Sequence, residues 1–354
     1  MEFDSHNVDD RLPAGAVSEV MTGKRVAVIG AGAFGTAMAT VAARAGNDVR
    51  LFARKAEVVD YINSKGRNPT YLTNFALPEN LRAVGSVQEA LADVNLLMLC
   101  IPTQMVPNWL AEHRELIDPK LLICNTAKGL YLKDKKLLSE AVNDALGRSQ
   151  PYALLSGPSF AKEIMQGMPT AVVVASKFLY HAVAVQRMLS TIIFRVYTSQ
   201  DVVGVELGGA LKNPLAIGAG IIEGKGLGIN TMAAFVTRSS QELQTLAKAM
   251  GGDEMTISGL SGVGDLMLTS FGDLSRNRTC GVRLVKGESM EEICKSSTVE
   301  GVPTAAVAVH FADMCSLELP IFRAIAAVLT GHLPIESAEQ HIMGRPLTQE
   351  RQIH

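Results

Sequence analysis

The sequence of 354 residues is poor in the residues that build disulfide and zinc sites. It has five cysteines and one tryptophan, and aromatic residues make up only 5%. Cys100, Cys124, Cys280, Cys294 and Cys315 form neither a C-x-x-C pair nor a His–Cys cluster with zinc spacing. We therefore expect reduced structural thiols and no metal site. Cys100 and Cys124 lie inside apolar runs, which predicts buried strand positions for both.

The chain also lacks an excess of charge and a long apolar run. Its formal net charge is −2, which gives no reason to expect nucleic acid or an anionic membrane as a partner. The stretch 202–222 is interrupted by Glu206 and Lys212, so no membrane span is predicted. Residues 1–23 contain no signal-peptide core and are predicted to form a mobile extension. We expect a cytoplasmic protein.

Short apolar runs dominate the first half of the chain. The length favours two domains, and 47% hydrophobic against 19% charged residues indicates a large buried fraction. Near-continuous apolar runs separated by helical segments predict a mostly parallel sheet covered on both faces. This is a doubly wound α/β domain, expected over residues 24–203. The predicted strands are 25–29, 49–53, 95–101, 121–124, 152–155, 171–175 and 194–197, with a helix over 36–45.

The second half has helical spacing and no strand signal. We expect an all-helical domain over 204–340 and a tail over 341–354. Pro214 removes one helical hydrogen bond and predicts a kink, while glycines at 204, 208, 209, 218 and 220 permit close packing. The predicted helices are 202–223, 230–250, 289–296, 302–315 and 320–330, with glycine-rich breaks at 224–228 and 259–264.

A G-x-G-x-x-G motif follows the first predicted strand and opens a helix. Gly30 suits the tight turn, Gly32 lets the backbone approach a pyrophosphate, and Gly35 lets the helix pack against the strand. The amides of Ala33 and Phe34 would meet the phosphates at the positive end of the helix. The motif in this context predicts a dinucleotide site.

The end of the second predicted strand indicates which dinucleotide binds. An acidic residue there would accept hydrogen bonds from the ribose 2′-hydroxyl, but Arg54 and Lys55 occupy the position and no acid occurs before Glu57. Two cations favour a 2′-phosphate, so NADPH is slightly preferred. In the alternative interpretation, Arg54 stacks on the adenine and both NAD and NADP bind.

Several polar segments follow predicted strands or lie in the helical half. Hydride transfer to a ketone needs a proton donor near the developing alkoxide, and a phosphorylated substrate needs cations and amides. Lys128 follows one strand and 157–161 follows another, with Ser159 available as a helix N-cap. Lys212 lies in the first long helix, while Asp265 and the run 275–278 come after a glycine-rich loop. Each alone would suit a solvated surface, but together behind a nucleotide motif they predict an active site.

These motifs, in this order, resemble those of the soluble NAD(P)-dependent glycerol-3-phosphate dehydrogenases, in particular the bacterial type. The resemblance covers roughly residues 24–330. The matching segments are Gly-Ala-Gly-Ala-Phe-Gly-Thr-Ala (30–37), Ala-Lys-Gly-Leu (127–130), Gly-Pro-Ser-Phe-Ala (157–161), Gly-Ala-Leu-Lys-Asn (209–213), Gly-Val-Gly-Asp-Leu (262–266), Ser-Arg-Asn-Arg (275–278) and Val-Glu-Gly-Val-Pro-Thr (299–304).

The resemblance implies reversible reduction of dihydroxyacetone phosphate to sn-glycerol 3-phosphate by a homodimer. It makes Lys212 the proton donor, Asp265 the residue that orients it, and Lys128 a second active-site lysine. The substrate site would comprise Lys128, Gly157, Ser159, Lys212, Asn213, Asp265, Thr269, Ser275, Arg276 and Asn277. The NAD or NADP site would comprise Gly30, Gly32, Ala33, Phe34, Gly35, Arg54, Lys55, Pro102, Lys128, Ala161, Arg276, Thr298 and Glu300.

Two alternative functions fit the same residues. A related hydroxyacid or ketopantoate-type reductase would share the two-domain plan and hold a carboxylate with Arg276 in place of a phosphate. A sensor without catalysis would bind NAD(P)H and not consume it. The presence of Lys128, Lys212 and Asp265 disfavours the sensor.

Overall fold

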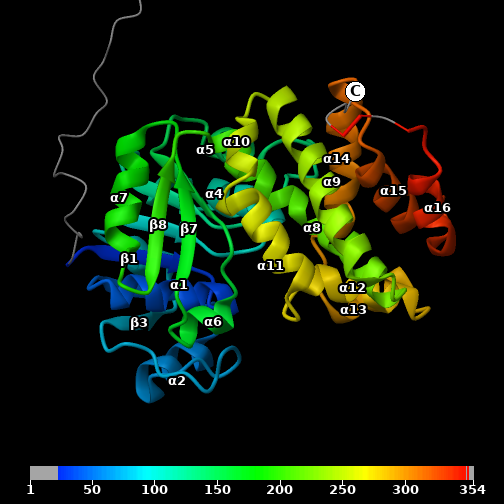
Figure 1. The fold of residues 1–354 in the computed structure, drawn as a ribbon. Coiled ribbons are helices and arrows are strands. Elements are labelled where there is room, and N and C mark those ends of the chain that lie inside the picture. The colour runs from blue at the N-terminus through cyan, green and yellow to red at the C-terminus, as the bar shows by residue number, and fades with distance from the viewer. Residues whose placement is uncertain (1–22, 348, 351–354) are drawn as a thin grey trace, which may run out of the picture.

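The computed structural model describes residues 23–347 and 349–350. Figure 1 shows a sheet with its covering helices on one side and a group of helices on the other. The extension predicted over residues 1–23 lies outside the described residues except for Gly23. The tail predicted from residue 341 begins inside α16 (Ala338–Met343).

One sheet runs through the first part of the described chain. Its strand order is β3-β2-β1-β4-β5-β6-β7-β8, and every neighbouring pair is parallel except β6 and β7. This order confirms the doubly wound fold. The prediction omitted β3. The strands are β1 (Arg25–Ile29), β2 (Asp48–Phe52), β3 (Leu81–Val84), β4 (Leu96–Leu99), β5 (Leu122–Asn125), β6 (Tyr152–Ser156), β7 (Thr170–Ala175) and β8 (Phe194–Ser199).

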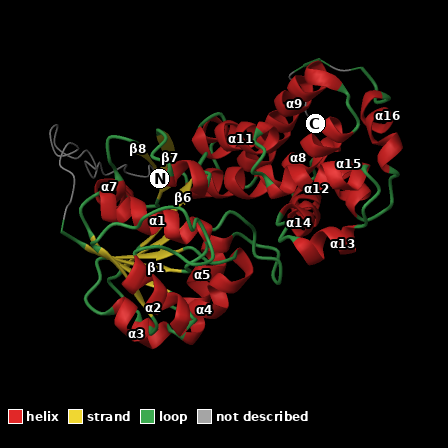
Figure 2. Cartoon of the chain, turned by 90° about the horizontal axis from the view of Figure 1, so that it is seen from below, coloured by secondary structure: helices red, strands yellow, loops and turns green. Residues whose placement is uncertain are grey.

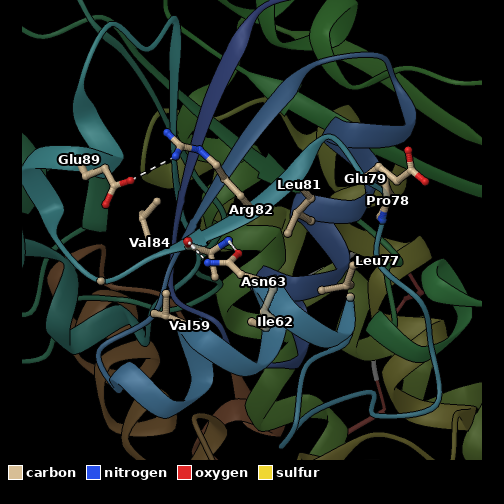
Figure 3. A pocket seen from close by; sticks show the side chains of 13 residues that line it. Val59, Ile62, Asn63, Leu77, Pro78, Glu79, Leu81, Arg82, Val84 and Glu89 are labelled. Carbon is tan, nitrogen blue, oxygen red and sulfur yellow. Dashed lines mark hydrogen bonds and ion pairs between the residues drawn. The ribbon is translucent and has the colours of Figure 1, made fainter.

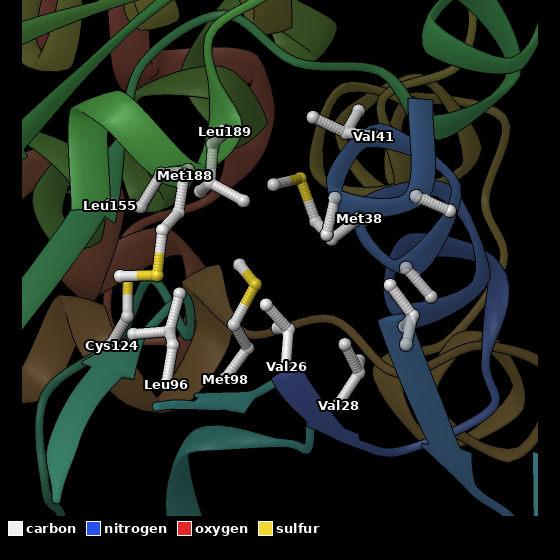
Figure 4. Close-up of a cluster of buried hydrophobic side chains, with 14 of the residues drawn as sticks. Val26, Val28, Met38, Val41, Leu96, Met98, Cys124, Leu155, Met188 and Leu189 are labelled. Carbon is white, nitrogen blue, oxygen red and sulfur yellow. The ribbon is translucent and has the colours of Figure 1, made fainter. Parts of the chain in front are cut away.

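Side chains alternate along each strand, so each strand contributes to both faces of the sheet, and both faces are buried. Val26 and Val28 of β1 join the cluster drawn in Figure 4, whereas Ala27 and Ile29 face a second cluster on the opposite side. Figure 2 shows α1 and α7 on one side of the sheet and α4 and α5 on the other. The near-continuous apolar strands of the sequence are thus explained by burial on two faces.

The helices around the sheet differ slightly from the prediction. The first begins at Ala33, where Thr36 was expected. Cys124 is fully buried as predicted, but Cys100 lies one residue beyond β4 and is only partly buried. The elements are α1 (Ala33–Arg44), α2 (Ala56–Lys65), α3 (Val87–Leu91), η1 (Thr103–Met105), α4 (Val106–Glu112), η2 (Arg114–Leu116), α5 (Leu138–Leu146), α6 (Ala161–Met165) and α7 (Leu179–Leu189).

The second part of the described chain contains helices and no strand. All five helices predicted from spacing are present, but four other helices, the π-helical turn η3 and the short turn η4 were not predicted. The elements are α8 (Val202–Gly224), α9 (Gly228–Ala249), α10 (Glu254–Ile257), η3 (Leu260–Gly264), α11 (Asp265–Phe271), α12 (Arg276–Val285), α13 (Met290–Ser296), α14 (Gly301–Met314), α15 (Pro320–Leu329), η4 (Ile335–Ser337) and α16.

Helix α8 is the central element of this part. Every residue from Gly204 through Ile221 is buried, and the helix packs against α9, α11, α12 and α14. It continues through Pro214. Small residues allow the close packing: a Cβ on Gly220 would lie 2.0 Å from the carbonyl oxygen of Arg278 in α12. In the described part of the chain, no helix combines the length and apolar character that crossing a membrane requires.

Candidate active site

The glycine motif forms the turn between β1 and α1. Gly30 has a φ of +112°, which favours glycine. A Cβ on Gly35 would lie 1.8 Å from the Gly30 carbonyl oxygen, so the helix can start this close to the strand only with glycine there. A Cβ on Gly32 would meet no heavy atom within 4 Å, so the turn borders open space at that point. With the amides of Ala33 and Phe34 at the helix start, this geometry fits a dinucleotide pyrophosphate.

The other predicted cofactor residues lie around this turn or across from it. Arg54 and Lys55 are exposed and begin two positions after the last residue of β2, and the Lys55 ammonium lies 3.9 Å from the Glu57 carboxylate. Pro102 precedes η1 after β4, beside β1 at the point where the strand order reverses. Ligands of doubly wound sheets bind outside the carboxyl ends of the strands at this point. Ala161 opens α6, Thr298 is exposed, and Glu300 precedes α14.

Lys128 and Lys212 share one buried carboxylate. The Lys212 ammonium donates to Asp265 Oδ1 at 2.6 Å, and the Lys128 ammonium donates to Asp265 Oδ2 at 2.8 Å. Asp265 is 0% exposed and Lys212 is 5% exposed. The three residues come from the β5–α5 connection, α8 and α11, so the sheet and the helical part meet here.

Burial controls the charge of Lys212. It lowers the pKa of this ammonium from 10.5 to about 8, because the charged form loses hydration. The Asp265 carboxylate raises the pKa and the nearby Lys128 charge lowers it. Burial is the largest of these causes, so the pKa of Lys212 lies below its usual value.

Tight glycine packing brings Asp265 to Lys212. Asp265 begins α11 directly after η3, and a Cβ on Gly262 within η3 would lie 2.0 Å from the Ile257 carbonyl oxygen. In α8, a Cβ on Gly208 would lie 2.8 Å from the Ser261 carbonyl oxygen. The glycine-rich stretch 259–264, predicted as a break, is therefore a compact turn packed against α8 that places the Asp265 carboxylate beside Lys212.

A chain of amide hydrogen bonds connects the site to α12 and α14. Asn213 donates from Nδ2 to the Lys128 carbonyl oxygen at 2.9 Å and accepts at Oδ1 from Asn277 Nδ2 at 2.9 Å. Asn277 Oδ1 in turn accepts from the Gly301 amide at 3.0 Å. Both asparagines were predicted at the substrate site, but the Gly301 amide was not, because only the folded arrangement brings it to Asn277.

The segment after β6 supplies two acceptors for Lys128. Its ammonium donates to the Gly157 carbonyl oxygen at 2.6 Å and to Ser159 Oγ at 3.3 Å. Ser159 was expected to be available as a helix N-cap, and this was wrong. Helix α6 begins at Ala161 after Phe160, and the Ser159 hydroxyl donates to Gly157 instead.

The remaining predicted substrate residues belong to α11 and α12. Thr269 is buried, and its hydroxyl donates to the Asp265 carbonyl oxygen at 2.7 Å. Ser275 caps α12 by accepting from the Arg278 amide at 3.2 Å. The run 275–278, interpreted as a polar stretch after a loop, is thus the start of a helix. Burial raises the pKa of Glu300, and the charge of the exposed Arg276 opposes part of that rise.

A surface hollow lies between α2 and β3 (Figure 3). Ile62 and Leu81 line it, and the Asn63 side chain pairs with both backbone groups of Ala83, at 3.0 and 2.8 Å. None of the predicted site residues lines this hollow. Among the described residues, no hydrogen bond or ion pair joins Arg54, Lys55 or Thr298 to the Lys128–Asp265–Lys212 cluster.

The chain is similar in sequence to known dehydrogenases over most of its length. Residues 25–182 match the family NAD-dependent glycerol-3-phosphate dehydrogenase N-terminus, and residues 201–340 match the corresponding C-terminus. A chloroplastic glycerol-3-phosphate dehydrogenase [NAD(+)] of Oryza sativa is 42% identical, covering 94% of this chain and 76% of that protein. The glycerol-3-phosphate dehydrogenase [NAD(P)+] of Geobacter metallireducens is 41% identical, covering 93% and 99%.

The fold is similar as well. The crystal structure of glycerol-3-phosphate dehydrogenase from Coxiella burnetii has a TM-score of 0.85 at 35% identity, covering 91% of this chain and 99% of that one. The two matched segments, the sequence identities and the doubly wound sheet with its helical partner agree with one another. They confirm the resemblance found in the motifs, and the chain belongs to the family of NAD-dependent glycerol-3-phosphate dehydrogenases.

Proposed function

We propose that this protein catalyses the reversible, NAD(P)H-dependent reduction of dihydroxyacetone phosphate to sn-glycerol 3-phosphate, with Lys212 as the proton donor. The observation that carries the assignment of roles is the buried Lys212 ammonium, held at 2.6 Å by Asp265 beside Lys128. The names of the relatives support the reaction, since both bacterial and plant relatives are glycerol-3-phosphate dehydrogenases.

The chemistry divides between cofactor and protein. When bound, NADH or NADPH supplies the hydride that reduces the ketone carbon. Lys212 gives its proton to the oxygen that becomes an alkoxide, and with a pKa near 8 it is mostly protonated at neutral pH. Of the three N–H groups of Lys212, one is directed to Asp265, so two remain for the substrate oxygen. In the oxidative direction the neutral amine accepts the proton.

Lys128 has a different role in this proposal. Its three N–H groups already have three acceptors, in Gly157, Ser159 and Asp265. It therefore contributes a fixed positive charge, and the bond to Ser159, the longest at 3.3 Å, is the one most easily exchanged for a substrate oxygen. Positive charge held in a partly buried site stabilises a developing alkoxide more strongly than the same charge in water.

The phosphate of the substrate needs donors near this cluster. Asn213 and Asn277 each use one amide hydrogen in the hydrogen-bond chain, which leaves the second of each for a ligand. Together with the Arg276 guanidinium, and with the Thr269 hydroxyl once it exchanges its bond to the Asp265 carbonyl oxygen, they are the groups that we assign to the phosphoryl oxygens. The exposed Arg276 can reach toward an incoming anion.

We also propose a slight preference for NADPH, a homodimer and a cytoplasmic location. Arg54 and Lys55 are exposed after β2, where two cations suit a 2′-phosphate. The dimer is an expectation from the family, and size-exclusion chromatography with light scattering tests it. Fractionation of cells that produce the protein tests the location.

One spectrophotometric assay tests the function against its alternatives. We expect oxidation of NADH and NADPH, followed by the loss of the absorbance of the reduced nicotinamide, with dihydroxyacetone phosphate but not with non-phosphorylated ketoacids. Lys212→Ala is expected to lower turnover by roughly 10²-fold or more and to leave cofactor affinity unchanged. Turnover confined to a ketoacid would favour the ketopantoate-type reductase, and cofactor binding without any turnover would favour the sensor.

A further inference from the structure

Helix α8 binds the β5–α5 connection at two points. Asn213 Nδ2 donates to the Lys128 carbonyl oxygen at 2.9 Å, at the start of this loop. Glu206 Oε1 accepts from the backbone amides of Leu138 and of Ser139, the latter at 3.1 Å, in the first turn of α5, where the loop ends. The 128–137 loop is thereby held at both ends by side chains of one helix.

The spacing of these side chains explains how one helix reaches both ends of the loop. Glu206 and Asn213 are seven residues apart, which is about two helical turns, so both lie on the same face about 10 Å apart along the axis. Lys212, next to Asn213, binds the carboxylate that also binds Lys128. The loop that carries one lysine is therefore held by the helix that carries the other.

Burying the Glu206 carboxylate costs free energy of folding. It is 5% exposed on a helix whose other buried residues are mostly apolar or small. Burial raises its pKa to about 7, and the two amide hydrogen bonds oppose that rise. Its Oε2 and the Tyr152 hydroxyl are both buried without a hydrogen-bond partner among the described residues. An apolar side chain would avoid this cost but would leave the first two amides of α5 without an acceptor, so the carboxylate links the start of α5 to α8.

A second glutamate provides a natural comparison. Glu242 of α9 is also buried, and it accepts from the amides of Ile321 at 2.8 Å and Phe322 at 3.2 Å at the start of α15. Burial raises its pKa to about 7 as well. Helix α15 carries none of the proposed site residues. Glu242 thus makes the same kind of contact without a connection to the site.

We propose that Glu206 is a positioning residue: it fixes the start of α5, where the 128–137 loop ends, to α8 and so keeps Lys128 in place beside Asp265. Gln104 also holds the loop, donating to the Leu130 carbonyl oxygen at 2.7 Å and accepting from the Leu132 amide at 3.0 Å. Loss of Glu206 therefore loosens the loop without releasing it. The loss of activity that we expect on removing Glu206 rests on the proposed function. The contact between Glu206 and the two backbone amides does not depend on it.

The experiment compares Glu206→Ala with Glu242→Ala. Both variants lose a buried carboxylate with two amide contacts, so both are expected to lower Tm. Hydrogen exchange followed by mass spectrometry reports on residues 129–137 without requiring activity. We expect faster exchange there in Glu206→Ala only, with kcat/KM for dihydroxyacetone phosphate about 10-fold lower than wild type. Glu242→Ala is expected to stay within about twofold of wild type.

A double substitution tests whether the effect acts through Lys128. In a Lys128→Ala background, Glu206→Ala is expected to cause little further loss of kcat/KM, because the side chain that it positions is already gone. Glu206→Gln keeps an oxygen acceptor for both amides and is expected to restore most of the activity. If Glu206→Ala does not fold, Glu206→Asp, which is one methylene shorter, is compared with Glu242→Asp in the same measurements.

The outcomes separate this inference from the proposed function. Equal changes in both glutamate variants, unchanged exchange over 129–137, or a full additional loss in the Lys128→Ala background would each overturn the positioning role. Absence of turnover in the wild-type protein would instead remove the proposed function, and the exchange data would still decide whether Glu206 anchors the loop.

Discussion

The pH at which the reduction rate falls is set by the charges around Lys212. Lys212 must carry its proton to act as an acid, so kcat/KM for reduction is constant at low pH and falls as the pH rises through about 8. Asp265 stabilises the ammonium from 2.6 Å. Asp265→Asn removes this negative charge and keeps the shape, so the midpoint is expected to move to lower pH.

The size of the shift follows from the short distance. An opposite charge this close changes a pKa by about 1–3 units, each equivalent to about 1.4 kcal/mol. A midpoint of about 7 in place of about 8 leaves roughly one quarter of Lys212 protonated at about pH 7.5, compared with roughly three quarters in the wild type. The smaller protonated fraction of Lys212 alone then lowers the rate at that pH by about threefold or more. Any displacement of the Lys212 ammonium would lower the rate further.

A second substitution is expected to shift the midpoint of the pH profile in the opposite direction. The Lys128 charge lowers the pKa of Lys212, so Lys128→Met is expected to move the midpoint upward even though overall activity falls. The assay is the initial rate of NADH oxidation at subsaturating dihydroxyacetone phosphate, measured from about pH 6 to about 10. Midpoints that stay at the wild-type pH in both variants would show that Lys212 is not the titrating acid.

Three further expectations concern the cofactor, the pH dependence of stability and the helix packing. Arg54→Glu is expected to raise the KM for NADPH far more than that for NADH, and equal effects would contradict a role at the 2′-phosphate. The pKa of Glu242 is raised to about 7, so the free energy of unfolding is expected to fall as the pH rises from about 4.5 to about 7. The fall is expected to be smaller in Glu242→Gln, and urea denaturation at each pH measures it. Gly281→Ala would place a Cβ 2.1 Å from the Ile217 carbonyl oxygen. We expect it to lower the free energy of unfolding, measured by urea denaturation, by about 1–3 kcal/mol. An unchanged denaturation midpoint would mean that α8 and α12 can separate freely.

The elements that the sequence predicted are those with a strong local signal. β1 is a continuous apolar run, and α8 is long with regular spacing, so both were predicted to within a residue of their bounds. β3 was missed because it is only four residues long and contains the exposed Arg82. α12 was missed because its first turn is polar, although Ser275 followed by a helical stretch was an available N-cap signal.

The candidate site depended on long-range contacts that no local pattern contains. Motifs selected Lys128, Lys212 and Asp265, but nothing in the spacing states that one carboxylate serves both lysines. The burial that dominates the pKa of Lys212 is likewise a property of the packed helices. Glu206 was noted only as an interruption of an apolar stretch, because its partners are backbone amides, which every residue type provides.

The shared carboxylate has a consequence for how the protein is made. Lys128 and Asp265 are 137 positions apart, so during translation the whole sheet can leave the ribosome before the counter-charge for either lysine exists. Until then, the ammonium groups stay hydrated, and α8 cannot bury Lys212 at low cost. A nascent chain that stops short of Asp265 would therefore expose the apolar surface of α8, and such fragments are expected to be substrates for chaperones and proteases.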